Sequence, residues 1–137
     1  MVQERRLSAR EKFDRVYAEV CAPRQLLSES VAVEIKLESG RSQRVLLQLL
    51  EHQRRAMVRF RTVIGSTERI RPTRLHFALE MNYQLPHGCL AVKNDELVMV
   101  DTLILEDADP GEIEAILDYL AVTADHYEAT MFGPDVH

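Results

Sequence analysis

Few residues in this 137-residue chain have the types and spacing of a catalytic site. Asp101-Thr102 lies inside an apolar run and could begin the loop of an aspartic protease. That loop needs glycine at the next position, where this chain has Leu103. A carboxylate on the inner side of a strand is costly to bury unless it is paired or hydrogen-bonded. We therefore expect Asp101 to be a structural carboxylate with a partner.

Histidine and cysteine give no complete site either. The five histidines form no metal-binding spacing with one another, and His87 with Cys89 supplies two ligands at most. A nucleophile dyad of Cys89 and a distant histidine stays open, although it matches no family signature. The chain has no phosphate-binding glycine loop, no G-x-S-x-G and no H-E-x-x-H. We expect no catalytic, cofactor-binding or metal-ligating residue, but a deep pocket gathering Asp101, His87 and Cys89 would indicate an enzyme.

The acidic residues after position 106 have two interpretations. As a calcium loop starting at Asp107, they would need glycine at the sixth position and glutamate at the twelfth, where the chain has Glu112 and Asp118. As a helix start, Asp109 is the N-cap, Pro110 is the first helical residue and Glu112 lies three residues after the cap. We prefer the helix cap, which also gains a favourable interaction with the helix dipole of about 0.3–1 kcal/mol.

Arginines form the most informative cluster. Residues 1–76 carry 16 Lys/Arg against 9 Asp/Glu (+7), whereas residues 77–137 carry one Lys against 13 Asp/Glu (−12), which gives the net charge of −5. Arg59 and Arg61 share one face of an alternating segment, and Phe60 points the other way. Three hypotheses follow: a solvated face partly neutralised by the acidic last helix, a patch for an acidic protein segment and, third, a nucleic-acid surface. Eight arginines fall within 31 residues: Arg44, Arg54, Arg55, Arg59, Arg61, Arg69, Arg71 and Arg74.

Five segments have the patterns of strands. Residues 31–37 and 56–64 alternate between apolar and polar side chains. Residues 44–50 are apolar on both faces, which predicts a central strand, with a short helix as the alternative. Residues 89–92 and 97–105 flank Asn94-Asp95, which is typical of a hairpin turn.

Three segments have the patterns of helices. Ser8 and Glu11 form a capping box for a helix that ends at Ala22-Pro23. A second helix carries Leu75 to Met81, with Thr73 as a possible cap, and the third runs from Asp109 to Tyr127 with apolar residues three and four apart. The first helix has Phe13, Val16, Tyr17 and Val20 on one face.

The order α-β-β-β-α-β-β-α predicts an α+β fold. Hairpin-length connections make neighbouring strands antiparallel, so we expect an antiparallel sheet of about five strands with three helices. We expect one domain, 1–137, with an ordered core of about 8–130 and loose ends at 1–7 and 131–137. No long apolar run or signal peptide occurs, so we expect a cytoplasmic protein without a membrane segment, in which Cys21 and Cys89 are free and mostly buried.

The segment Leu79-Glu80-Met81-Asn82-Tyr83-Gln84-Leu85-Pro86-His87-Gly88 resembles the leucine–asparagine–leucine–proline–glycine signature of bacterial YbjN-type proteins. Those proteins are similar in fold to the class I chaperones of type III secretion. The motif similarity covers about residues 75–128 and continues through residues 101–107 and 109–112. Before residue 75 it rests on the order of elements.

This resemblance implies a homodimer without enzymatic activity that holds a segment of another protein. It also implies that the middle helix makes the dimer contact. In this chain the middle helix contains Leu75, Phe77, Leu79 and Met81. Apolar residues extend more than halfway round this helix, which independently predicts burial on two sides, by its own sheet and by a second subunit. Unlike the secretion chaperones, which are commonly acidic throughout, this chain is basic in its first half.

Our leading hypothesis is therefore a homodimeric, chaperone-like module that binds a protein client. The alternative hypothesis is a nucleic-acid-associated accessory protein that uses the arginine strand, and an enzyme with an unrecognised site is third. The candidate partner-binding residues lie on the first helix and on the arginine strand: Phe13, Val16, Tyr17, Val20, Arg59 and Arg61.

Overall fold

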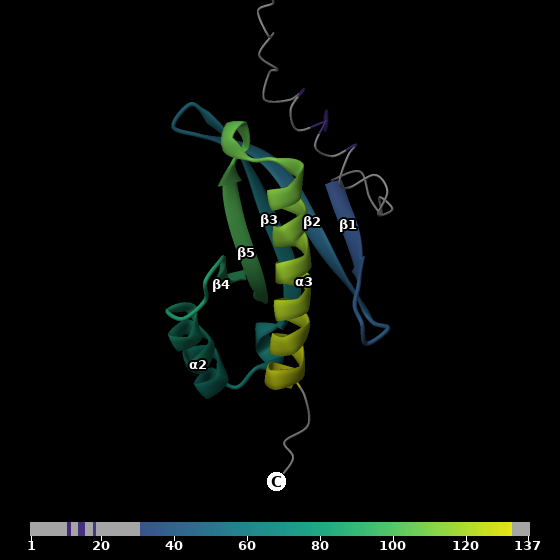
Figure 1. Cartoon of the computed structure of the whole chain (residues 1–137). Helices are drawn as coiled ribbons and strands as arrows, with labels where there is room; N and C mark the ends of the chain where they lie inside the picture. Colours follow the sequence, from purple (N-terminus) through teal and green to yellow (C-terminus); the bar gives the residue numbers. More distant parts are fainter. Residues whose placement is uncertain (1–10, 12–13, 16–17, 19–30, 133–137) are drawn as a thin grey trace, which may run out of the picture.

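The computed structural model describes residues 11, 14, 15, 18 and 31–132 (Figure 1). It is an α+β structure with a five-stranded antiparallel sheet, as predicted. The predicted first helix lies almost entirely outside the described residues, and Phe13, Val16, Tyr17, Val20 and Cys21 lie outside them. The described elements are β1 (Val31–Lys36), β2 (Ser42–His52), β3 (Arg55–Ser66), α2 (Pro72–Asn82), β4 (Cys89–Lys93), β5 (Glu96–Ile104) and α3 (Pro110–Phe132), with short 3-10 turns at Thr67–Arg69 and Leu105–Asp107.

The strands lie in the order β1-β2-β3-β5-β4. Two-residue turns join β2 to β3 and β4 to β5, and both residues of each turn have positive φ: Gln53 and Arg54 in one, Asn94 and Asp95 in the other. This geometry matches the twist of antiparallel strands. The excursion through α2 lets β5 pair with β3 and leaves β4 at the edge. The run at 44–50 is an interior strand, as predicted, which excludes the short-helix alternative.

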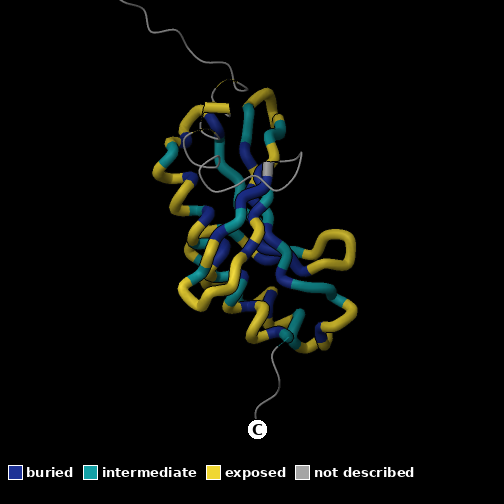
Figure 2. Tube along the Cα trace, turned by 90° about the vertical axis from the view of Figure 1, so that its right-hand side faces the viewer, coloured by how far each residue is buried: buried dark blue, intermediate teal, exposed yellow. Residues whose placement is uncertain are grey.

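The main core lies between α3 and one face of the sheet. Figure 1 shows α3 running along the strands on this face, and Figure 2 shows buried residues through the middle of the molecule with exposed ones at the turns. Burying such side chains is the main favourable contribution to folding. The fully buried members include Val45, Phe60 and Met99 from the sheet and Ile113, Leu117, Leu120 and Ala124 from the helix.

The start of α3 is as predicted, but its end is not. The amide of Glu112 donates to Asp109 Oδ1 at 2.8 Å, which is the N-cap bond. The helix continues to Phe132, beyond the predicted end at Tyr127, and so includes the first two residues of the loose end expected at 131–137. Residues 133–137 lie outside the described part of the chain. Met131 is buried, and Arg74 donates to its carbonyl oxygen at 2.7 Å, so tertiary contacts hold the last turn.

The start of α2 also differs from the prediction. Arg71 occupies the N-cap position without a side-chain cap bond, and Pro72 is the first helical residue. Thr73 lies inside the helix, so its predicted capping role was wrong. Proline is favoured at this place because its φ is already helical and its missing N–H would have had no partner there. Neither described helix is long and apolar enough to cross a membrane.

Candidate protein-binding surfaces

The first candidate surface is the outer side of α2. Of its eleven residues only Ala78 is fully buried, while Leu75 and Met81 are half-buried against the core. Leu79 is 63% exposed and Phe77 is 47% exposed. Apolar side chains of this size are normally covered, so α2 presents more apolar surface than its own domain needs.

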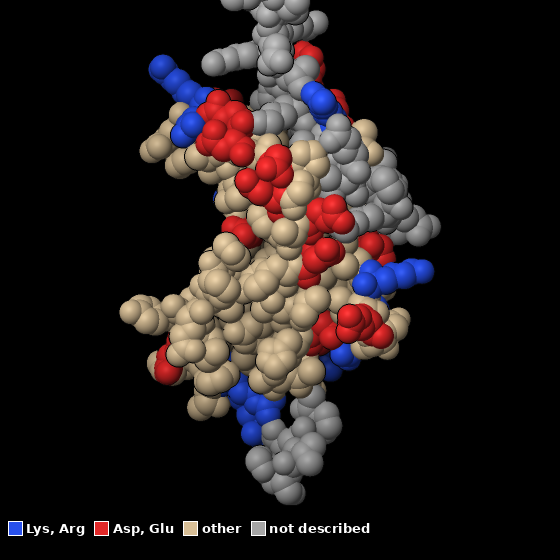
Figure 3. Space-filling model, in the orientation of Figure 1, with Lys and Arg blue, Asp and Glu red and all other residues tan. Residues whose placement is uncertain are grey.

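The exposed apolar residues form two flanks. Residues three and four apart are neighbours on a helix, which places Leu79 beside Tyr83 on one flank and Phe77 beside Met81 on the other. Between the flanks, His76 Nε2 lies 2.6 Å from Glu80 Oε1, which is the i, i+4 pair expected of a surface helix. Figure 3 shows a mostly uncharged area over α2 and the end of α3, whereas acidic side chains line the rest of α3. We call Phe77, Leu79, Tyr83 and the His76–Glu80 pair the α2 surface.

The predicted dimer residues divide between the two sides of α2. Leu75 and Met81 pack against the core of their own chain, and Phe77 and Leu79 point away from it. The prediction that the sheet covers one side of this helix is therefore confirmed. Coverage of the opposite side by a second subunit stays a prediction, and it now concerns Phe77 and Leu79 more than the other two.

The C-terminal end of α2 is attached to the sheet by one side chain that the sequence reasoning missed. Asn82 Nδ2 donates to the carbonyl oxygen of Leu90 at 2.9 Å, and Asn82 Oδ1 accepts from the amide of Leu90 at 2.6 Å. The side-chain amide thus takes the place of a neighbouring strand at the free edge of β4. The asparagine between the leucines of the quoted motif was the available signal, because an amide offers a donor and an acceptor together.

The second candidate surface is the face of the sheet opposite α3. Alternation along the strands sends every second side chain to this side, which faces away from α2 and α3. We call it the open face. Its residues are Ala32 and Glu34 on β1, Arg44, Leu46, Gln48 and Leu50 on β2, Met57, Arg59, Arg61 and Val63 on β3, Val98, Val100, Thr102 and Ile104 on β5, and Cys89 and Ala91 on β4.

Arg59 and Arg61 lie on the open face, on the side of β3 opposite Phe60, as the alternation predicted. Neutralisation by the acidic last helix was wrong for these two residues, because α3 lies against the other side of the sheet. Within the described part of the chain, neither forms an ion pair. Arg59 Nε reaches Thr102 Oγ1 at 3.4 Å, and Arg61 Nε is buried without a hydrogen-bond partner.

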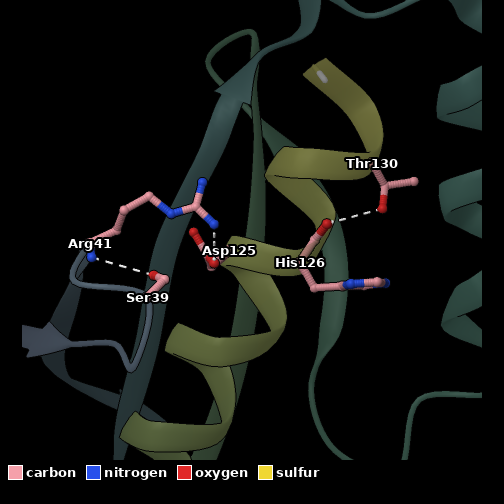
Figure 4. Close-up of polar contacts among 5 residues, drawn as sticks. All are labelled: Ser39, Arg41, Asp125, His126 and Thr130. Carbon is pink, nitrogen blue, oxygen red and sulfur yellow. Dashed lines mark hydrogen bonds and ion pairs between the residues drawn. The ribbon is translucent and has the colours of Figure 1, made fainter. Parts of the chain in front are cut away.

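Arginines at the rim of the sheet behave differently. Arg41 Nη2 lies 2.7 Å from Asp125 Oδ2 of α3, an ion pair visible in Figure 4. Arg55 Nε donates to Glu106 at 3.0 Å, and this hydrogen bond raises the pKa of the Arg55 guanidinium further above its ordinary value. The acidic second half thus pairs with arginines at the edges and the ends of the sheet and leaves the centre of the open face positive.

The residues considered for catalysis do not converge. Cys89 pairs with Val100 on the open face, whereas Asp101 pairs with Phe60 on the helix-covered face. Asp101 Oδ1 accepts from the amide of Thr102 at 2.9 Å, which is a structural role as expected. His87 is exposed, and its ring lies edge-on to Tyr119 at 5.9 Å. The arrangement that would have indicated an enzyme is therefore not formed.

The expectation for Cys89 also has an outcome. Cys89 is a free thiol, as predicted, but it is exposed rather than buried. In the part of the chain that the structure describes, no three histidine, cysteine or acidic side chains come close enough to hold a metal ion.

The chain matches no protein-family model, and no curated protein matches its sequence.

Proposed function

We propose that this chain is a non-enzymatic, homodimeric module of the chaperone-like type that binds a segment of a partner protein. The exposure of Leu79 and Phe77 on α2 carries the proposal. Fully burying a side chain such as leucine or phenylalanine gains about 1.5–3 kcal/mol, and a two-fold contact counts every such residue twice. The resemblance to YbjN-type proteins and to class I secretion chaperones supports the same use of the middle helix.

A second copy of this chain suits the α2 surface better than a charged partner does. The surface carries one acid, Glu80, which is already paired with His76, and apolar side chains on both flanks. A two-fold contact places the same patch on both subunits, so a patch with strong net charge would repel itself. The α2 surface has no such charge and can meet its own copy.

Cross-linking through a single cysteine tests this contact. Leu79→Cys would be made in a chain carrying Cys21→Ser and Cys89→Ser, and treated with a short bismaleimide linker. Val122→Cys in the same background is the matched control. Val122 lies on α3 and is 59% exposed, a fraction similar to the 63% of Leu79. On a denaturing gel we expect the Leu79 variant to give a covalent dimer and the Val122 variant to give no cross-linked product. Equal yields, or no dimer from either, would contradict a contact through α2.

A nucleic-acid accessory function is the second candidate. The unpaired charges of Arg59 and Arg61 favour it. It ranks lower because the open face intersperses its arginines with aliphatic side chains such as Leu46 and Val100, and none of its residues is aromatic. Single-stranded nucleic acid is bound by stacking on aromatic rings as well as by charge. Binding of an oligonucleotide that weakens steeply with salt and disappears in Arg59→Glu with Arg61→Glu would favour this candidate.

A further inference from the structure

The open face combines apolar surface with arginine in a regular pattern. Cross-strand register places residues of β2, β3 and β5 side by side. Successive rows along β3 therefore place the two arginine-containing rows between two apolar rows. The rows are Leu50, Met57 and Ile104; then Gln48, Arg59 and Thr102; then Leu46, Arg61 and Val100; then Val63 beside Val98.

Apolar residues are numerous on this face, although none of them is among the strongly exposed large side chains of the described residues. Val98 is only 1% exposed, yet it does not belong to the core beneath α3. Leu46, Met57, Val63 and Val100 are half-buried although no described helix covers them. A sheet face that only has to meet water usually carries polar side chains at such positions. This face therefore has the composition of a contact surface.

The arginines on this face keep their hydrogen-bonding capacity. The Nε of Arg61 is inaccessible to water and donates to no described group. A buried donor without a partner costs free energy that an arriving acceptor would recover. A hollow of about 400 Å³ lies beside Arg61 on the β1–β3 side of the face. It is lined by Arg44, Leu46 and Val63 and also by the carboxylate of Glu34, which accepts a hydrogen bond from Ser42 Oγ at 2.6 Å. A carboxylate is the acceptor whose geometry best fits a guanidinium group.

The position of these residues decides which shape of partner fits. β3 is hydrogen-bonded to β2 on one side and to β5 on the other, so the middle of the open face offers side chains and no free backbone edge. An extended peptide laid there would leave its own backbone groups without partners. A helix satisfies its backbone internally. Carboxylates four residues apart on a helix are separated by a rise of about 6 Å, close to the roughly 7 Å between Arg59 and Arg61 along the strand.

A second copy of this face is a poor occupant. A two-fold contact would bring Arg59 and Arg61 against the same residues of the other subunit, and like charges in contact disfavour association. The occupant must instead carry negative charge together with apolar side chains. We propose that the open face binds an acidic amphipathic helix of a partner protein. This inference rests on the proposed protein-binding function and names the class of partner.

The test uses synthetic peptides and the full chain. The probe is a peptide of about 18 residues, or five helical turns, with leucine along one face, glutamate on both sides of it and alanine elsewhere. One control peptide has every glutamate replaced by glutamine. A second control has the same composition with leucine and glutamate in strict alternation, which forms no amphipathic helix. Calorimetric titration at low and at physiological salt measures each affinity.

Two double variants locate the site. Arg59→Gln with Arg61→Gln removes two charges from the open face. Arg54→Gln with Arg69→Gln removes the same charge from exposed positions outside it. We expect the helical glutamate peptide to bind about tenfold more weakly to the first variant and within about twofold of wild type to the second. Should the first variant unfold, Arg44→Gln with Arg59→Gln replaces it, with the same expectation.

Three results would overturn the proposal. If the glutamine peptide bound as tightly as the glutamate peptide, negative charge would not be required for binding. If the alternating peptide bound as tightly, a helical shape would not be required. Displacement of the peptide by a single-stranded oligonucleotide that binds more tightly would assign the face to nucleic acid. None of these results depends on α2. Cross-linking through Leu79 can therefore succeed while the peptide fails to bind, and the peptide can bind while cross-linking fails, so the two proposals are tested separately.

Discussion

On β3, Phe60 points toward α3 and is completely buried, whereas its neighbours Arg59 and Arg61 point to the other side of the sheet, where no described helix lies. The helix-covered face is filled mainly with apolar side chains that need only a fit in shape, and its buried polar residues Gln43 and Thr62 are hydrogen-bonded to each other. The open face has two arginine-containing rows in its middle, with an apolar row on each side of them. Consecutive residues of one strand thus belong to two different faces. The first face stabilises the fold, and we propose that the second binds a partner.

The contrast in stability is the largest effect that can test this comparison. Phe60→Ala should lower the free energy of unfolding by about 3–5 kcal/mol, because it opens a cavity beneath α3. Arg59→Ala, one residue away, should change it by no more than about 0.5 kcal/mol. Urea denaturation followed by circular dichroism measures both. Similar losses in the two variants would show that the open face is part of the core and would end its assignment as a binding surface.

The edge of the sheet gives a smaller effect. Asn82→Ala removes both hydrogen bonds to Leu90 and should cost about 1–3 kcal/mol, since it leaves backbone groups of β4 without a partner. Hydrogen exchange of the Leu90 amide should accelerate in this variant. Gln84→Ala, an exposed change just after the helix, is the control and should leave that amide unchanged. Protection that survives the loss of Asn82 would mean that β4 does not depend on this contact.

The smallest predicted effect is a change in the free energy of unfolding at alkaline pH. It comes from Tyr127, which is buried against the helix-covered face. Burial, with a contribution from nearby Tyr119, raises the pKa of the Tyr127 hydroxyl above its ordinary value. A raised pKa in the folded state means that the unfolded chain ionises first. The stability from neutral Tyr127 is therefore complete below the ordinary tyrosine pKa of about 10 and is lost as the pH rises through the folded value.

Tyr127→Phe should accordingly flatten the decline in unfolding free energy above about pH 10. Tyr83→Phe is the matched control, since Tyr83 is 95% exposed on the α2 surface, and it should leave the decline unchanged. Denaturant titrations at a series of alkaline pH values measure the slopes. An identical slope in Tyr127→Phe and wild type would show that another group is responsible.

Local patterns in the sequence were sufficient to predict the five strands and the helices α2 and α3, and the orientation of the strand faces. Alternation assigned Phe60 and Arg59 to opposite sides of β3, and the spacing of Asp109 and Glu112 located the start of α3. These features depend on residues close together in the chain. Local hydrogen bonds and side-chain periodicity decide them, so the sequence alone is informative.

Features that depend on distant contacts were not predictable in the same way. The place of β4 at the edge follows from the pairing of β5 with β3, which no local pattern encodes. The last turn of α3 persists because Arg74 holds the carbonyl of Met131. Net charge suggested that acidic α3 neutralises the arginine strand, but charge counts do not say on which side of a sheet a helix packs.

The central claim is a homodimer formed through α2, and solution mass tests it most directly. Light scattering at low and high salt should give a mass near twice 15.7 kDa at both, because an apolar contact does not weaken as salt rises. Leu79→Gln should shift the mass toward that of a monomer, and Val122→Gln should leave it unchanged. A wild-type monomer at every salt concentration, or a dimer that survives Leu79→Gln intact, would contradict the account.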